Sequence, residues 1–171
     1  AAYETSPSPI DLQGQSANFY KDISYGSHER QKFDLLLPET NGSPVPLIVY
    51  MHGGGFTTGS KENLYNFRED EVRQALAQGV GFASINYRLL ETNDSEGVEK
   101  ALHDAARAIQ YIRFIGTSSL NIDKENLAVY GVSAGAGAGL WVGLSDELAD
   151  LSGATADKVD DESTRVKGIA I

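Results

Sequence analysis

The stretch LAVYGVSAG, residues 127–135, joins a short apolar strand to the pattern G-x-S-x-G. This pattern is typical of a sharp turn from a strand into a helix, with the central serine, here Ser133, held in a strained backbone conformation. Side chains at positions 131 and 135 would collide with each other or with the neighbouring strand, so both positions need glycine. Ser133 would lie at a helix N-terminus, where negative charge is favoured. The stretch predicts a serine nucleophile, and the alternative is a glycine-rich turn that serves packing alone.

A second glycine-rich segment, HGGGF at residues 52–56, follows directly after the apolar run that ends at Met51. Three successive glycines let the backbone approach a substrate closely, and their amides can converge on one oxygen. Acyl transfer needs such donors because the carbonyl oxygen becomes an anion in the tetrahedral intermediate. Alone, the segment is equally consistent with a flexible loop; together with the Ser133 turn it favours an oxyanion-binding loop. We expect His52 to orient this loop by hydrogen bonding rather than to act as the catalytic base.

Strands and helices are expected to alternate along the chain. Apolar runs predict strands over residues 18–25, 31–37, 45–51, 80–87, 127–130 and 166–171. Helical periodicity and small-residue composition predict helices over residues 68–78, 97–115 and 134–148. This order predicts a mostly parallel sheet with helices on both faces and an antiparallel edge formed by the first two strands. We expect residues 1–17 to form a loose N-terminal arm, and residues 18–171 to form part of one domain.

The composition argues against several classes of protein. An excess of 24 acidic over 14 basic residues gives a net charge of −10, which disfavours nucleic acid and anionic membrane surfaces as partners. The chain contains no cysteine, so disulfides and cysteine metal sites are excluded. No apolar run approaches the roughly 18 residues of a membrane span. The Ser/Pro-rich beginning up to Pro9 resembles a mature terminus after signal-peptide removal, so we expect a secreted or periplasmic protein.

The two glycine motifs, with three further segments, resemble the α/β-hydrolase superfamily and, within it, the hormone-sensitive-lipase-like carboxylesterases. The further segments are Asn86-Tyr87-Arg88-Leu89, Leu102-His103-Asp104-Ala105-Ala106 and Asn121-Ile122-Asp123. The resemblance spans most of residues 18–145. It implies an α/β-hydrolase fold, here truncated after the sixth strand, and an ester hydrolase that acts through a serine nucleophile and an acyl-enzyme.

The same resemblance implies roles for individual residues. In that family the second and third glycines of the loop and the residue after the serine form the oxyanion hole, which implies this role for Gly54, Gly55 and Ala134. Gly53 and Phe56 are the candidate substrate contacts beside them. A small ester is the implied substrate, and the chemistry requires no metal and no cofactor.

The sequence lacks the other two catalytic groups that the resemblance implies, an acid and a histidine. In the family the acid and the histidine follow the serine along the chain, whereas His28, His52 and His103 all precede Ser133. The acidic residues from 146 to 161 precede the sixth strand and are expected to form a solvated loop. We therefore expect a C-terminal remainder of the same precursor, as a second chain or a missing segment, to supply an Asp or Glu and a His. The alternatives are a non-catalytic ligand-binding protein on a hydrolase scaffold and an inactive fragment.

Overall fold

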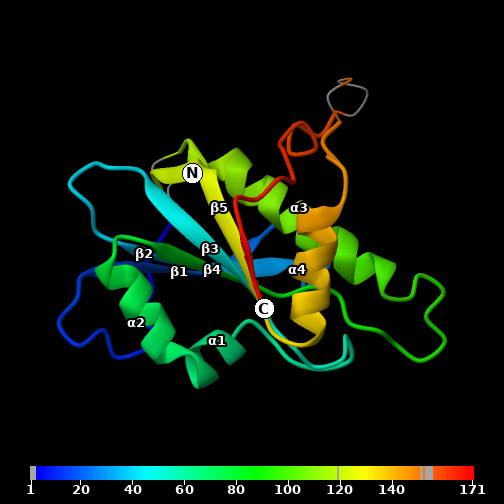
Figure 1. The fold of residues 1–171 in the computed structure, drawn as a ribbon, viewed down its shortest axis with the longest axis horizontal. Helices are drawn as coiled ribbons and strands as arrows, with labels where there is room; N and C mark the ends of the chain where they lie inside the picture. Colours follow the sequence, from blue (N-terminus) through cyan, green and yellow to red (C-terminus); the bar gives the residue numbers. More distant parts are fainter. Residues whose placement is uncertain (1–2, 119, 151, 153–155) are drawn as a thin grey trace.

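The computed structural model describes residues 3–118, 120–150, 152 and 156–171. They form one six-stranded sheet flanked by helices (Figure 1). The strands are β1 (Ala17–Ser24), β2 (Lys32–Pro38), β3 (Val45–Met51), β4 (Gly81–Ile85), β5 (Ile122–Gly131) and β6 (Ile169–Ala170). The helices are α1 (Asn63–Phe67), α2 (Glu69–Ala77), α3 (Glu99–Gly116) and α4 (Ala134–Leu144).

The strands follow the order β1-β2-β4-β3-β5-β6 across the sheet. The pairs β1–β2 and β2–β4 are antiparallel, whereas β3 is parallel to both β4 and β5, and β5 is parallel to β6. Every residue of β4 is buried, as expected of a strand covered on both faces. The predicted mostly parallel sheet with an antiparallel edge is therefore confirmed.

The helices cover both faces of the sheet and divide the core into two clusters. On one face, α3 and α4 contribute Ile109 and Val142 to a core that includes Val49 of β3. On the other face, α2 contributes Val72 to a core that includes Tyr50, the next residue of β3. Successive residues of a strand point to opposite faces, so β3 supplies both cores.

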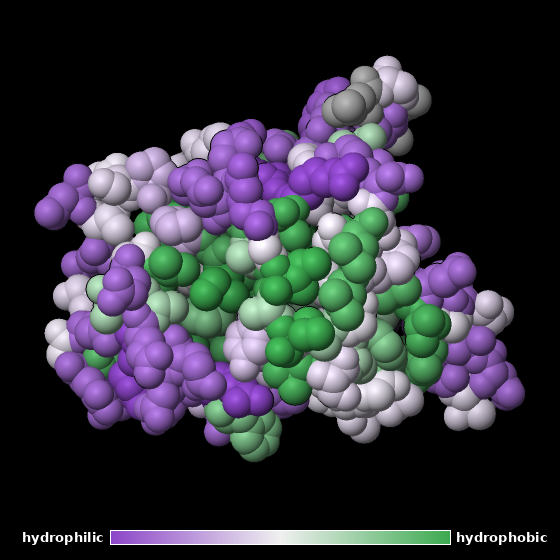
Figure 2. All heavy atoms as spheres, viewed as in Figure 1, coloured by the Kyte–Doolittle hydropathy of each residue, from purple (hydrophilic) through white to green (hydrophobic). Residues whose placement is uncertain are grey.

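One part of the second face is not covered by a helix in the described residues. A hollow lies there over β3, β5 and β6, lined by Ile48, Phe82, Ala128, Tyr130 and Ile169. Its exposed surface is mostly apolar, and Figure 2 shows the apolar side chains gathered in the centre of this face. Most exposed apolar patches of this kind mark a surface that packs against other polypeptide or a ligand.

The sheet brings the two glycine motifs together. Met51, the last residue of β3, is paired with Gly131, the last residue of β5. Since the two strands are parallel neighbours, the loops that follow them leave the sheet side by side at its carboxyl edge. The backbone amide of Val132 donates to the carbonyl of Met51 at 3.2 Å, which ties the two loops at their origin.

The N-terminal segment, expected to be a loose arm, lies against the domain over its described residues. Ser6 forms a bridge with Phe19 of β1, and Ile10 is buried in the second core. Arg73 of α2 donates to the carbonyl of Asp11 at 3.0 Å, and Gln15 donates to the carbonyl of Arg73 at 3.1 Å. These contacts depend on residues from α2, which sequence proximity does not reveal.

Four elements differ most from expectation, among them β5, which begins at Ile122 instead of residue 127. Helix α1 was not expected, because five residues are too few to show a helical period. Helix α4 ends at Leu144, since Ser145 is extended and its hydroxyl donates to the carbonyl of Trp141. Strand β6 is limited to Ile169 and Ala170. No helix of the described residues is long and apolar enough to cross a membrane.

Candidate active site

Ser133 has the backbone geometry expected of a strained strand-to-helix turn. Its φ is 54° and its ψ is −116°, a region that L-residues rarely adopt. It immediately precedes α4, and its side chain is exposed to solvent. Strained backbone of this kind persists only where the surrounding structure enforces it, and it concentrates at functional sites.

The flanking glycines are required by close backbone contacts. A Cβ atom added at Gly131 would collide with the carbonyl oxygen of Gly135. One added at Gly135 would collide with the carbonyl oxygen of Met51 and would lie 2.6 Å from that of His52. Side chains at these positions would thus collide both within the turn and with the neighbouring strand, as expected. Because glycine has no Cβ atom, α4 can pack closely against β3.

The glycine loop lies directly against the serine. A Cβ atom at Gly53 would lie 3.0 Å from the carbonyl oxygen of Val132 and 3.2 Å from the Cβ of Ser133. The next residues, Gly54 and Gly55, have φ values of 118° and 61°, which glycine adopts without penalty. Phe56 also has a positive φ, 61°, so the strained turn continues through the motif.

Three amide groups in the glycine loop and in the turn at Ser133 are free. Within the described part of the chain, the backbone N–H groups of Gly54, Gly55 and Ala134 donate to no other group. Ala134 is the first residue of α4, where N–H groups have no partner within the helix. Unpaired amide donors next to an exposed serine can stabilise a negatively charged oxygen.

His52 is fully buried and is held in one orientation beneath this loop. Its Nδ1 lies 2.6 Å from the carbonyl oxygen of Gly53, and its ring stacks on Tyr87 with a centroid separation of 4.3 Å. Burial lowers the pKa of His52 to about 4; the Gly53 hydrogen bond opposes this shift and the charge of Arg30 adds to it. His52 is therefore neutral at neutral pH and bonded to the loop, as expected of an orienting residue rather than a base.

The other candidate triad groups lie away from Ser133. His28 is exposed in the turn between β1 and β2, and His103 lies on α3 beside Trp141. Asp104 of α3 is buried and is bonded to the backbone amide and the guanidinium of Arg88. No histidine among the described residues forms a hydrogen bond with Ser133.

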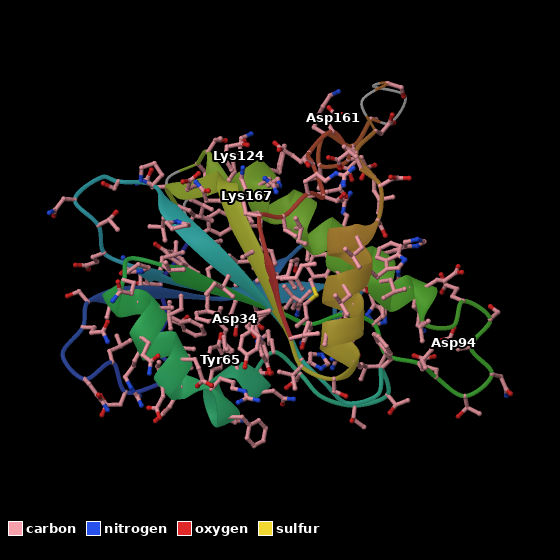
Figure 3. All side chains as sticks on the ribbon, viewed as in Figure 1. Asp34, Tyr65, Asp94, Lys124, Asp161 and Lys167 are labelled. Carbon is pink, nitrogen blue, oxygen red and sulfur yellow. The ribbon has the colours of Figure 1, made fainter. Side chains whose placement is uncertain are left out.

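The acidic segment after α4 is also remote from the serine. Figure 3 shows Asp161 beyond the C-terminal end of α4, whereas Ser133 precedes the N-terminal end of this helix. Glu147 is partly buried, which acts to raise its pKa. Hydrogen bonds from Ser163 and Thr164 outweigh this effect and lower the pKa of Glu147 to about 2. These carboxylates stabilise their own segment. In the described residues, no group of three or more His, Asp or Glu side chains is arranged to hold a metal ion.

Two structural features of the site were not found by sequence reasoning. Arg30, from the turn before β2, donates to groups at both ends of the glycine loop. Lys61 anchors the far end of this loop through its Nζ, which lies 3.0 Å from the buried carboxylate of Asp34. Tyr65 also donates to Asp34 at 3.0 Å, and Figure 3 shows the two side chains next to each other. Both cations lie in polar stretches, so no pattern distinguishes them from surface residues.

A family model describes almost all of this structure. The model of the BD-FAE family matches residues 33–170, which include most of β2, all of β3, the glycine loop, Ser133 and β6. The chain belongs to the BD-FAE family. This membership agrees with the resemblance to hormone-sensitive-lipase-like hydrolases that the two motifs carry.

Several curated proteins similar to this BD-FAE chain are esterases. Para-nitrobenzyl esterase of Bacillus subtilis is 29% identical over 138 residues, which cover 75% of the chain and 27% of the relative. Probable carboxylesterase 3 of Arabidopsis thaliana is 28% identical over 154 residues, which cover 84% of the chain and 47% of the relative. The chain thus spans less than half the length of these curated relatives.

The solved structures confirm the α/β-hydrolase fold. A truncated form of a carbohydrate esterase from gut microbiota superimposes with a TM-score of 0.72 at 19% identity. The alignment covers 94% of the BD-FAE chain and 57% of that protein. At this identity the likeness concerns the fold alone.

Proposed function

We propose that this chain contains the nucleophile and the oxyanion hole of a carboxylic ester hydrolase. The observation that carries the proposal is the position of Ser133: it is strained and exposed, and it lies against a loop with two free amide groups. The esterase relatives support the same reaction class.

In the proposed reaction, Ser133 Oγ attacks the carbonyl carbon of a small ester and forms a tetrahedral intermediate. The N–H groups of Gly54, Gly55 and Ala134 donate to its oxyanion, while Gly53 and Phe56 contact the substrate. Collapse of the intermediate releases the alcohol and leaves an acyl group on Ser133. Water then attacks the acyl-enzyme and releases the carboxylic acid.

This reaction needs a general base that takes the Ser133 proton and returns it to the leaving alcohol. His52 is buried, neutral and engaged with the glycine loop, so it does not fill this role. We propose that a histidine and an orienting Asp or Glu come from polypeptide outside these 171 residues, on the same chain or on a second chain. The uncovered apolar hollow over β3, β5 and β6 supports additional polypeptide at this face.

The first test is made on the natural full-length protein. Its intact mass under denaturing conditions shows whether one or two polypeptides are present, and a fluorophosphonate probe reports an activated serine. We expect stoichiometric labelling at Ser133, and none in a Ser133→Ala variant. A folded protein that neither labels nor hydrolyses p-nitrophenyl acetate would contradict the proposal and favour a non-catalytic ligand-binding protein.

A further inference from the structure

Arg30 connects both ends of the glycine loop to the segment that follows β4. Its Nε donates to the carbonyl of Tyr87 at 2.9 Å, and its Nη2 donates to the carbonyl of Gly59 at 2.9 Å. The same Nη2 lies 3.3 Å from Nε2 of His52. One guanidinium thus contacts the first residue of the loop, its closing turn and Tyr87, the second residue after β4.

These contacts determine the tautomer of His52. The carbonyl of Gly53 can only accept a hydrogen bond, so Nδ1 of His52 carries the hydrogen. The guanidinium of Arg30 can only donate, so Nε2 is the acceptor. Tyr87 adds a second restraint, because its hydroxyl donates to the His52 carbonyl at 2.5 Å. The imidazole therefore transmits the position of Arg30 to the Gly53 carbonyl.

The direction of the Gly53 carbonyl decides the direction of the next amide. In a planar trans peptide the C=O and the following N–H point in opposite directions. Since the Gly53 carbonyl is turned toward His52, the N–H of Gly54 is turned away from the histidine. This N–H is one of the free donors near Ser133.

The next peptide is oriented separately. The Gly54 carbonyl accepts from the backbone amides of Thr57 and Thr58, both at 3.0 Å, and from both hydroxyls, at 3.1 and 3.2 Å. The N–H of Gly55 is thereby turned away from the threonines. The two candidate oxyanion donors depend on two different sets of contacts, and only the Gly54 donor depends on Arg30.

Arg30 is also unusual in its environment. It is partly buried, and none of the ion pairs among the described residues includes it. Its hydrogen bonds reach backbone carbonyls and a neutral imidazole. Burying a cation without a carboxylate partner is unfavourable, so its position is not explained by ion pairing.

We infer that Arg30 is a positioning residue of the proposed esterase: through His52 and the Gly53 carbonyl, it directs the Gly54 N–H toward the oxyanion. The inference rests on the proposed function. It requires that loss of Arg30 weakens binding of the transition state more than binding of the ester. Substrate affinity changes little, because Arg30 lies behind the loop.

The test compares Arg30→Met and Arg30→Lys in the natural full-length protein, with p-nitrophenyl acetate as substrate and active sites counted by fluorophosphonate labelling. We expect Arg30→Met to lower kcat by about 10- to 100-fold, somewhat less than complete removal of an oxyanion donor, with KM within about three-fold. Binding of a trifluoromethyl ketone, which forms a tetrahedral adduct with the serine, weakens in parallel. Arg30→Lys keeps the positive charge but lacks the planar set of guanidinium N–H donors, so we expect it to retain more of kcat than Arg30→Met does.

Arg113 provides a matched control. It is a buried arginine that, like Arg30, donates to backbone carbonyls, here of Lys124 and Arg165, but its hydrogen bonds reach no part of the glycine loop. We expect Arg113→Met to lower the stability of the fold while leaving kcat per labelled site unchanged.

Each outcome bears on a different claim. A wild-type protein that neither labels nor turns over refutes the proposed function and the inference with it. An active wild type whose Arg30→Met variant keeps its kcat refutes the inference alone, as does an equal loss of kcat in Arg113→Met. If Arg30→Met does not fold, Arg30→Ala is tested instead, with and without millimolar guanidinium. Restoration of kcat by guanidinium supports the positioning role of Arg30, and a folded variant whose kcat is not restored refutes it.

Discussion

The strain at Ser133 predicts that replacing this proposed nucleophile with glycine stabilises the protein. Ser133 has φ 54° and ψ −116°, where the Cβ atom of an L-residue is crowded by the backbone. Glycine has no Cβ and adopts this conformation freely. Ser133→Ala retains the Cβ, so it removes the hydroxyl without relieving the strain and is the proper reference for Ser133→Gly.

The size of the effect follows from two opposing terms. Relief of the backbone strain contributes about 1–3 kcal/mol, and the larger entropy loss of glycine on folding costs about 0.5–1 kcal/mol. The side chain is exposed, so its removal sacrifices little packing. We expect Ser133→Gly to be more stable than Ser133→Ala by about 1 kcal/mol, which raises the Tm by roughly 2–4 °C for a domain of this size.

The measurement is denaturant unfolding of the two variants in the natural full-length protein, with thermal unfolding as a check. Both variants lack the Ser133 hydroxyl, so we expect no difference between them in substrate turnover or labelling. A Ser133→Gly variant that is less stable than Ser133→Ala would refute the reasoning, because it would mean that the turn is not strained in the folded protein.

Three further perturbations test the packing and electrostatics around the site. Gly135→Ala forces a Cβ atom into two carbonyl oxygens and should lower the free energy of unfolding by about 3 kcal/mol or more. The control is Gly137→Ala, whose Cβ atom meets nothing within 4 Å and which should raise the free energy of unfolding by about 0.5–1 kcal/mol. Denaturant titration compares the two variants. Because the pKa of His52 is about 4 in the folded state and near 6.5 when unfolded, the unfolded chain binds more protons between these values. Stability is therefore greatest above pH 6.5 and falls as pH decreases toward 4, by up to roughly 3 kcal/mol, and a His52→Gln variant should show a flatter profile. Lys61→Met leaves the buried carboxylate of Asp34 without its cation and should lower the free energy of unfolding, measured in urea, by about 3–5 kcal/mol. An added Asp34→Asn substitution should recover part of this loss. If the effects of the two substitutions are simply additive, the two side chains do not stabilise each other.

The element order and the two motifs were predictable because they depend on local pattern. β3 was predicted with the observed limits, since an apolar run between a turn and the glycine loop leaves little choice. The glycines at 131 and 135 were predicted from the steric demands of a sharp turn, and the structure shows the expected collisions. Helix α1 was missed because five residues carry no usable period.

The supporting residues of the site were not predictable. Arg30 and Lys61 lie in polar segments, and a single charged residue has the same appearance in a sequence whether it is exposed or buried. Their partners are 22 and 27 positions away, at His52 and Asp34. Only the pairing of β2 with β4, and of β4 with β3, brings these positions together.

The sequence by itself determined the type of fold, the position of Ser133 at a strand-to-helix turn and the presence of a glycine-rich loop after β3. These follow from periodicity and from steric limits that act over a few residues. Only the tertiary structure decided that this loop lies against Ser133, that His52 is neutral, and that Arg30 directs the loop from behind. Such features depend on burial and on hydrogen-bond direction between distant segments, which exist only once the sheet is assembled.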